Sequence, residues 1–164
     1  MLDCDAVYHE LLQTDPELLC AIEAAFPGTV KDGCLDRRSL GSRVFSDPEA
    51  LLRLNHITHG AVKNEVLRRL ACKPALAAID AIALFEGGLA PLCDVTVAVT
   101  APLEARVERL TNRDDISPEY ARARIAAQKP QSFFEERCTH VLRNDGTREQ
   151  FRQACRALLW QILG

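Results

Sequence analysis

The chain has 164 residues, enough for one compact domain, and its 48% hydrophobic and 26% charged residues exclude a disordered chain, a collagen-like repeat and a small disulfide scaffold. Its apolar stretches, such as residues 75–83 around Asp80, are far shorter than the roughly 18 residues that cross a bilayer. The net charge is −3, from 20 basic and 23 acidic residues, so we expect no general affinity for nucleic acid.

Signals for helix starts dominate the first half of the chain. Asp15-Pro16-Glu17 and Asp47-Pro48-Glu49 each combine an N-cap acid, a proline at the first helical position and an acid in the first turn. Each predicts a helix. Because residues from about 5 to 73 contain no convincing strand, we expect them to form a helical lobe.

Strand signals come later. Residues 77–85, apolar except for Asp80, and the β-branched residues 94–99 are predicted to be buried strands of a parallel sheet, and a third strand is predicted at about 140–143. Ser117-Pro118 predicts a further helix, and the capping box of Thr147 and Gln150 predicts the last one, to about Leu163. Strands alternating with helices indicate an α/β fold with helices on both faces of the sheet. Since only residues 1–3 precede the first helical pattern, this sheet is expected to be at least one strand short.

Two pairs of carboxylates are candidates for chemistry. Asp3 and Asp5 lie two residues apart at the end of a short strand, where side chains point into the ligand crevice of such sheets, and one of them suits a general base. The alternative is that one caps the following helix and the other is solvated. Asp80 lies inside an apolar strand and Glu86 ends it, beside Gly87-Gly88; a rim position and a turn cap are the alternatives.

Arginines are concentrated near the C-terminus, where residues 101–164 carry eleven basic residues, ten of them Arg. The planar guanidinium fork suits phosphate, so a small polyanionic ligand is expected. Five arginines surround one short loop and could clamp phosphates: Arg106, Arg109, Arg113, Arg122 and Arg124. The alternative is a solvated helix face paired with Glu104 and Glu108.

Other motifs are weak or missing. His56 and His59 have helical spacing but no third ligand nearby, so no metal site is predicted. The seven cysteines are scattered and the first five residues are not those of a secretory signal, which indicates reduced thiols and a cytoplasmic location. No glycine is followed by lysine, so the phosphate-binding loop G-x-x-x-x-G-K-[ST] does not occur in the chain.

Several stretches taken together resemble one family, the dephospho-coenzyme A kinases. In order along essentially the whole chain they are residues 3–6 (DCDA), 35–41 (LDRRSLG) leading to Val44-Phe45, Leu54-Asn55 with His59, 84–86 (LFE), Arg109 to Arg113-Asp114, 123–128 (ARIAAQ) and 144–146 (NDG). Each is weak alone, and their order and spacing are specific. Where the family usually has an aspartate before the last strand, this chain has Thr139.

The resemblance implies a fold similar to that of the nucleoside monophosphate kinases. One domain over residues 1–164 is expected, with a helical coenzyme A lobe at about 5–73, an arginine-bearing lid at about 100–130 and the remainder as core. It also implies transfer of the γ-phosphoryl group of ATP to the ribose 3′-hydroxyl of dephospho-coenzyme A, with Mg²⁺ expected. The expected partners are small molecules, and no association with a membrane is expected.

Site roles follow from the resemblance residue by residue. Asp5 matches the proposed catalytic base and Asp3 lies beside it. The residues expected to bind the acceptor are Asp3, Arg38, His59 and Glu86. Arg113 is expected to be catalytic and to bind ATP together with Arg109, and the turn near the adenine is matched by Asn144 and Gly146.

The chain departs from the family at its start. The family's first, central strand, its P-loop and its first helix would precede Asp3, and a unit of roughly 30 residues is expected to be missing. We therefore expect an N-terminally truncated form that is inactive by itself, which an in-frame P-loop upstream of codon 1 would establish. The alternative is a non-catalytic module or pseudo-kinase that binds coenzyme A or a nucleotide.

Overall fold

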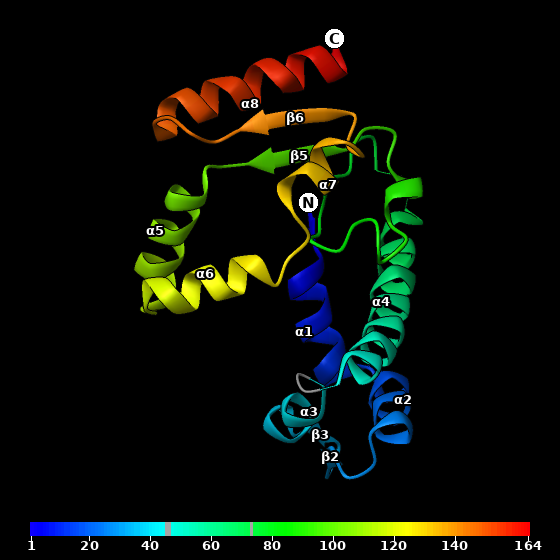
Figure 1. Ribbon diagram of the computed structural model, residues 1–164. Coiled ribbons are helices and arrows are strands. Elements are labelled where there is room, and N and C mark those ends of the chain that lie inside the picture. Colours follow the sequence, from blue (N-terminus) through cyan, green and yellow to red (C-terminus); the bar gives the residue numbers. More distant parts are fainter. Residues whose placement is uncertain (45–46, 73) are drawn as a thin grey trace. The chain divides into compact units, whose positions relative to one another are not determined.

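The computed structural model describes residues 1–44, 47–72 and 74–164 (Figure 1). Phe45 of the matched motif and Lys73 at the end of the expected lobe lie outside the described residues. The chain forms two compact units, Met1–Leu92 and Cys93–Gly164, here called the N-terminal and C-terminal units. This division does not test the expected limits of the lobe and the lid, which stay predictions.

Four helices make up most of the N-terminal unit: α1 (Cys4–Thr14), α2 (Pro16–Ala25), α3 (Arg37–Val44) and α4 (Pro48–Leu70). Both predicted Asp-Pro helix starts are confirmed. The Asp15 carboxylate accepts hydrogen bonds from the first-turn amides of α2, and the Asp47 carboxylate does the same for α4. Each cap satisfies donors that would otherwise have no partner at a helix start.

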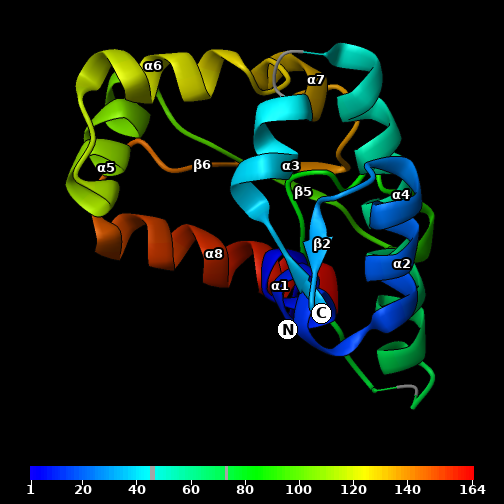
Figure 2. The same cartoon turned by 90° about the horizontal axis from the view of Figure 1, so that it is seen from below.

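The core of this unit lies where α4 packs against the other three helices. Figures 1 and 2 both show α2 running beside α4. Val7 of α1, Leu18 and Ile22 of α2 and Val66 of α4 are each at most 3% exposed. Burial of such side chains, at about 1.5–3 kcal/mol each, holds the bundle together.

A two-stranded parallel sheet joins the two ends of the N-terminal unit. β1 (Leu2–Asp3) pairs with β4 (Ile79–Asp80), with Leu2 opposite Ile79. The predicted strand over 77–85 is therefore wrong beyond two residues. This stretch is rich in alanine, a poor strand former, and residues 82–88 form turns closed by the Gly87 amide on the Ala83 carbonyl (2.7 Å). Asp80 is exposed, so the prediction of a carboxylate inside a buried strand is wrong as well.

The expectation of no strand between residues 5 and 73 is also wrong. β2 (Val30–Lys31) and β3 (Cys34–Leu35) form an antiparallel hairpin. Asp32 and Gly33 connect them with φ of 52° and 74°, the two positive values that a tight I′-type turn needs. Asp-Gly is the local sequence signal for this turn.

The C-terminal unit is built on the parallel pair β5 (Val97–Thr100) and β6 (His140–Arg143), with Val97 opposite His140. Its helices are α5 (Leu103–Asp114), α6 (Pro118–Ala126), α7 (Gln131–Glu135) and α8 (Arg148–Leu163), and α8 packs along β6 (Figure 1). The strand at 140–143 is confirmed, whereas the strand predicted at 94–99 begins three residues later. The starts of α6 and α8 are confirmed, the latter with both hydrogen bonds of the capping box.

Thr139, which stands where the family usually has an aspartate, makes hydrogen bonds to Thr96. Its amide donates to the Thr96 hydroxyl (3.0 Å), and its own hydroxyl donates to the Thr96 carbonyl (2.8 Å). The Thr96 amide in turn donates to the Thr139 hydroxyl (3.0 Å). These bonds continue the pairing of β5 and β6 by one residue toward their N-termini, so threonine has a structural role at this position.

The elements together form an α/β fold with parallel strands and many helices. In the part of the chain that the structure describes, no helix is both long enough and apolar enough to span a bilayer.

Leu18→Ala is expected to lower the free energy of unfolding by about 2–5 kcal/mol, because it leaves a cavity in the core of the N-terminal unit. Leu18 is 3% exposed. The matched control is Leu52→Ala on α4, where the leucine is 69% exposed and the change should stay within about 0.5 kcal/mol. Urea unfolding followed by circular dichroism measures both, and equal losses would contradict the assigned core.

Candidate functional site

A pocket of about 240 Å³ opens in the N-terminal unit. Three segments line it: the first turns of α1, the middle of α4 and residues 81–89. Its apolar wall includes Leu54, Val62 and Leu89, and its polar wall is formed by Cys4, Asp5, Tyr8, Asn55, Thr58 and His59. An apolar cavity with a few convergent polar groups is the usual form of a small-molecule site.

Helical spacing places these side chains together. On α4, residues 54, 55, 58, 59 and 62 follow the i, i+1, i+4, i+5, i+8 pattern of a single helix face, and on α1 residues 4, 5 and 8 do the same. The pocket is therefore a property of two facing helices, and the turn at residues 82–88 closes one side of it.

Asp3 and Asp5 have different surroundings although only one residue separates them. The Asp3 carboxylate is the N-cap of α1 and accepts hydrogen bonds from the amides of Asp5 (2.9 Å) and Ala6 (3.0 Å). Asp5 lies in the first turn of α1, is exposed and lines the pocket, so the expected solvated aspartate is Asp5. Of the two carboxylates, Asp5 is the one placed to meet a ligand in the pocket.

Tyr8 and Thr58 contribute hydroxyl groups that the sequence patterns did not single out. Burial raises the pKa of Tyr8, and the nearby Arg37 opposes that rise only in part, so the phenol stays a neutral donor. The Thr58 hydroxyl donates to the Leu54 carbonyl (3.0 Å), one turn earlier on α4. A helical spacing search over polar residues next to Asp5 and His59 would have found both.

His59 lines the pocket, whereas His56, one turn earlier on α4, is exposed and does not. Within residues 1–44, 47–72 and 74–164, no three His, Cys, Asp or Glu side chains gather as a metal site would need. The helical spacing of the two histidines therefore places only one of them at the candidate site.

Arg38 and Glu86 are both exposed. Arg38 lies in the first turn of α3, and Glu86 directly precedes Gly87, whose backbone lines the pocket. Neither side chain lines the pocket itself, so their expected roles in acceptor binding stay predictions.

The expected arginine clamp lies in the C-terminal unit, and its members already have partners. Arg113 contacts both oxygens of Asp114, with Nε 2.7 Å from Oδ1, and Arg124 Nη1 lies 2.6 Å from Oδ2. Arg122 makes a bidentate pair with Glu104, and Arg106 donates to the Gln128 side chain (2.9 Å). The arginines thus join α5 to α6 and the segment after it.

Arg109 reaches the turn that follows β6. Its Nη2 donates to the Asn144 carbonyl (3.0 Å) and to the Asn144 side-chain oxygen (3.2 Å). Gly146 follows in the same turn, where an added Cβ would lie 2.6 Å from the Gln150 amide oxygen of the capping box. The structure therefore brings Arg109 and Asn144 together, and a side chain at position 146 would require the Gln150 side chain to move.

Comparison with known proteins decides the family. The family model described as dephospho-CoA kinase matches residues 1–150. The chain belongs to the dephospho-CoA kinase family. Two relatives of that name are those of Deinococcus radiodurans, 39% identical over 99% of this chain and 80% of the relative, and Anaeromyxobacter dehalogenans, 37% identical over 100% and 81%. Members of this family are transferases.

Solved structures agree on the fold. The crystal structure of TT1252 from Thermus thermophilus is 36% identical, with a TM-score of 0.79, and the match covers 99% of this chain and 84% of that one. A dephospho-CoA kinase from Campylobacter jejuni is 24% identical with a TM-score of 0.66, over 98% and 83%. The α/β fold of the dephospho-CoA kinases is thereby established for this chain.

Acid should weaken the arginine pairs of the C-terminal unit. Hydrogen bonds from Arg113 and Arg124 hold the pKa of Asp114 at about 2, below its ordinary 3.8. A lowered carboxyl pKa stabilises the fold above the unfolded value, and this contribution is lost as the pH falls from about 4 to about 2. The difference in melting temperature between wild type and Asp114→Asn should therefore shrink over that range.

The matched control for this prediction is Asp115→Asn. Asp115 is exposed and adopts a left-handed conformation that asparagine tolerates. Thermal melts from pH 5 to pH 2 measure all three proteins. A difference between wild type and Asp114→Asn that stays constant with pH would contradict the assigned pairs.

Proposed function

We propose that the pocket of the N-terminal unit binds dephospho-coenzyme A and that the protein transfers the γ-phosphoryl group of ATP to its ribose 3′-hydroxyl. The observation that carries this proposal is the position of Asp5: a carboxylate on the wall of a mostly apolar pocket, in a chain of the dephospho-CoA kinase family. Family membership favours this kinase over a non-catalytic binding module.

The reaction needs little covalent chemistry from the protein. The acceptor oxygen forms a bond to the γ-phosphorus, the bond from that phosphorus to the bridging oxygen breaks, and ADP leaves. The hydroxyl proton passes to a base, the role proposed for Asp5. We assign Asp3 to fixing the start of α1, and His59, Arg38 and Glu86 to binding the acceptor.

Charge neutralisation is assigned to the C-terminal unit. Arg113 and Arg109 are proposed to bind the phosphates of ATP, with Asn144 and Gly146 near its adenine. Arg113 would exchange the Asp114 carboxylate for phosphate, and Arg109 would exchange the two Asn144 oxygens. The guanidinium fork then gains a more highly charged, bidentate partner.

Mg²⁺ is proposed as the counter-ion of ATP. The described residues offer no cluster of three metal-binding side chains, so no residue is assigned to it and no step depends on it. Likewise, the G-x-x-x-x-G-K-[ST] loop occurs nowhere in the sequence, and the expected inactivity of residues 1–164 alone stays a prediction.

We further propose that the protein acts in the cytoplasm on small molecules and has no nucleic-acid partner. The seven thiols that form no disulfide support the location, and the negative net charge supports the absence of a nucleic-acid partner.

Calorimetric titration with dephospho-coenzyme A tests the acceptor site, because binding does not require turnover. The wild-type chain should bind it saturably. His59→Ala should raise Kd roughly two- to tenfold, the equivalent of about 0.5–1.5 kcal/mol for one polar contact. His56→Ala is the matched control on the same helix and should leave Kd unchanged. Equal effects of the two variants, or no binding by the wild type, would contradict the assigned pocket.

Asp5→Asn should lower kcat by about 10²- to 10⁴-fold while changing KM for dephospho-coenzyme A far less, because it keeps the size of the side chain and removes the proton acceptor. Coupled ADP release, measured with a chain in which the P-loop is restored, gives both constants. Activity within threefold of wild type would remove Asp5 from the mechanism.

A further inference from the structure

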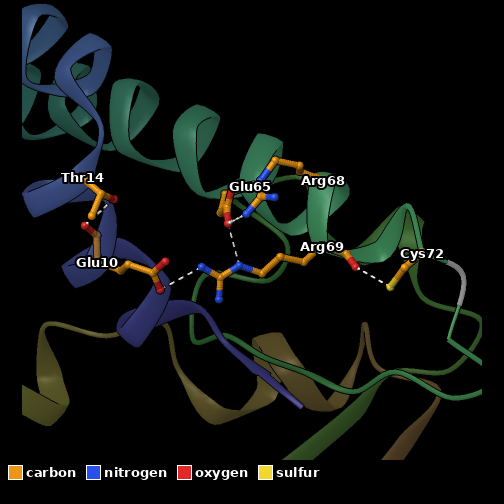
Figure 3. Close-up of polar contacts among 6 residues, drawn as sticks. All are labelled: Glu10, Thr14, Glu65, Arg68, Arg69 and Cys72. Atoms are coloured by element: carbon orange, nitrogen blue, oxygen red, sulfur yellow. Dashed lines mark hydrogen bonds and ion pairs between the residues drawn. The ribbon is translucent and has the colours of Figure 1, made fainter.

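Four charged side chains join α1 to α4 outside the pocket (Figure 3). Arg69 Nη2 lies 2.8 Å from Glu10 Oε2 on α1, and Arg69 Nε lies 2.6 Å from Glu65 Oε1 on α4. Arg68 binds both oxygens of Glu65 at 2.7 Å. Figure 3 shows the Arg69 side chain extending from α4 toward α1, with one carboxylate on each side of its guanidinium.

The two arginines differ in reach and in exposure. Arg69 contacts carboxylates on both helices, whereas Arg68 pairs with Glu65, three residues earlier on its own helix. The Arg69 side chain is 27% exposed and that of Glu65 11%, against 73% for Arg68. Solvent therefore screens the pair of Arg69 with Glu65 less than an ordinary surface ion pair, whereas Glu10 is 55% exposed and its pair with Arg69 is screened more.

Glu65 anchors this cluster. Hydrogen bonds from Arg68 and then from Arg69 hold its pKa at about 2, below the ordinary 4.5. It is therefore ionised at neutral pH and retains one guanidinium partner even if either arginine is removed. The bond from Arg69 to Glu10 is the contact of this cluster that ties the two helices together.

The same two helices form the pocket. Asp5 and Tyr8 come from α1, and Asn55, Thr58 and His59 come from α4. Glu10 is two residues beyond Tyr8, and Glu65 and Arg69 are three and seven residues beyond Val62, or roughly 5–10 Å along the axis of α4. None of the four cluster residues is among those that line the pocket.

We propose that Arg69 is a positioning residue for acceptor binding: by joining Glu10 of α1 to Glu65 of α4, it fixes the spacing of the two helices and hence the width of the pocket. This inference rests on the proposed function, because it takes dephospho-coenzyme A as the occupant. Arg69 acts through the helices and touches no reacting group.

The side-chain type matters for this role. Arg69 uses two different nitrogens, Nε and Nη2, to bind carboxylates on two helices at once. The guanidinium is planar, so those two directions are fixed relative to each other. A lysine would keep the charge and lose this fixed geometry, so Arg69→Lys should restore only part of what Arg69→Met loses.

The decisive comparison is Arg69→Met against Arg68→Met, since each variant leaves Glu65 with one arginine. Calorimetric titration with dephospho-coenzyme A should give a Kd about fivefold or more above wild type for Arg69→Met, and within twofold for Arg68→Met. Glu10→Gln should reproduce the effect of Arg69→Met. All variants are compared at a temperature where circular dichroism shows each fully folded.

A merely structural role would lower the melting temperature of Arg69→Met without changing Kd, and that result would overturn the proposal. Equal Kd values for the Arg69 and Arg68 variants would overturn it too. Amide hydrogen exchange of the ligand-free proteins is the second arm: α1 should exchange faster in Arg69→Met than in Arg68→Met. If the wild type does not bind dephospho-coenzyme A, the proposed occupant is wrong. Amide hydrogen exchange of α1 then still decides whether Arg69 holds α1 against α4. Unchanged exchange of α1 in Arg69→Met would show that it does not.

Discussion

The packing of α1 against α4 is the constraint on which the N-terminal unit depends. Val7 and Leu11 of α1 and Val62 and Val66 of α4 belong to one buried cluster, each at most 9% exposed. Their removal from water, at about 25 cal/mol per Å² of apolar surface, stabilises the helix pair. The polar pocket residues lie on the same two helices, and Val62 belongs both to this buried cluster and to the pocket wall. A site made of short side chains on facing helices keeps its geometry only while that contact stays close-packed.

How far the sequence predicts the structure depends on the range of the interaction. Asp15-Pro16 and Asp47-Pro48 predicted their helices correctly because the cap is a bond between a side chain and amides two or three residues away. The strand predicted at 77–85 is wrong beyond two residues because apolar character does not distinguish a strand from an alanine-rich segment that turns at Gly87. The Asp32-Gly33 pair is a local sequence signal for a hairpin turn, but the helix signals on both sides of it favoured a purely helical lobe. Asp5 was a candidate from its spacing with Asp3, and the family resemblance assigned its role and that of His59. Tyr8 and Thr58 share helix faces with these two residues, so helical spacing alone indicates them once the two helices are predicted.

The arginines of the C-terminal unit illustrate a different principle. Each one named as a possible phosphate ligand has a carboxylate, amide or carbonyl partner within the unit. These contacts order long, flexible side chains before any ligand arrives, which lowers the entropy lost on binding. The Arg113 guanidinium is 68% exposed and therefore accessible to a ligand, and a phosphate group carries more charge than the Asp114 carboxylate that it would replace. The pairing of Arg113 with Asp114 is therefore compatible with its proposed role, and it orders the arginine between ligand-binding events.

The two aspartates at the start of α1 make different contacts. Asp3 accepts two amide hydrogen bonds and so fixes where the helix begins, and one of those amides belongs to Asp5. The backbone of Asp5 is thereby held while its carboxylate extends to the pocket wall, where none of the hydrogen bonds found among the described residues ends on it. A proton acceptor for a substrate hydroxyl needs this combination, a fixed backbone and an oxygen not already committed to the protein. The alternative in which one aspartate caps the helix and the other is solvated fits both residues, since Asp3 is the cap and Asp5 is exposed. The same cap leaves the Asp5 carboxylate available for its proposed role as the base.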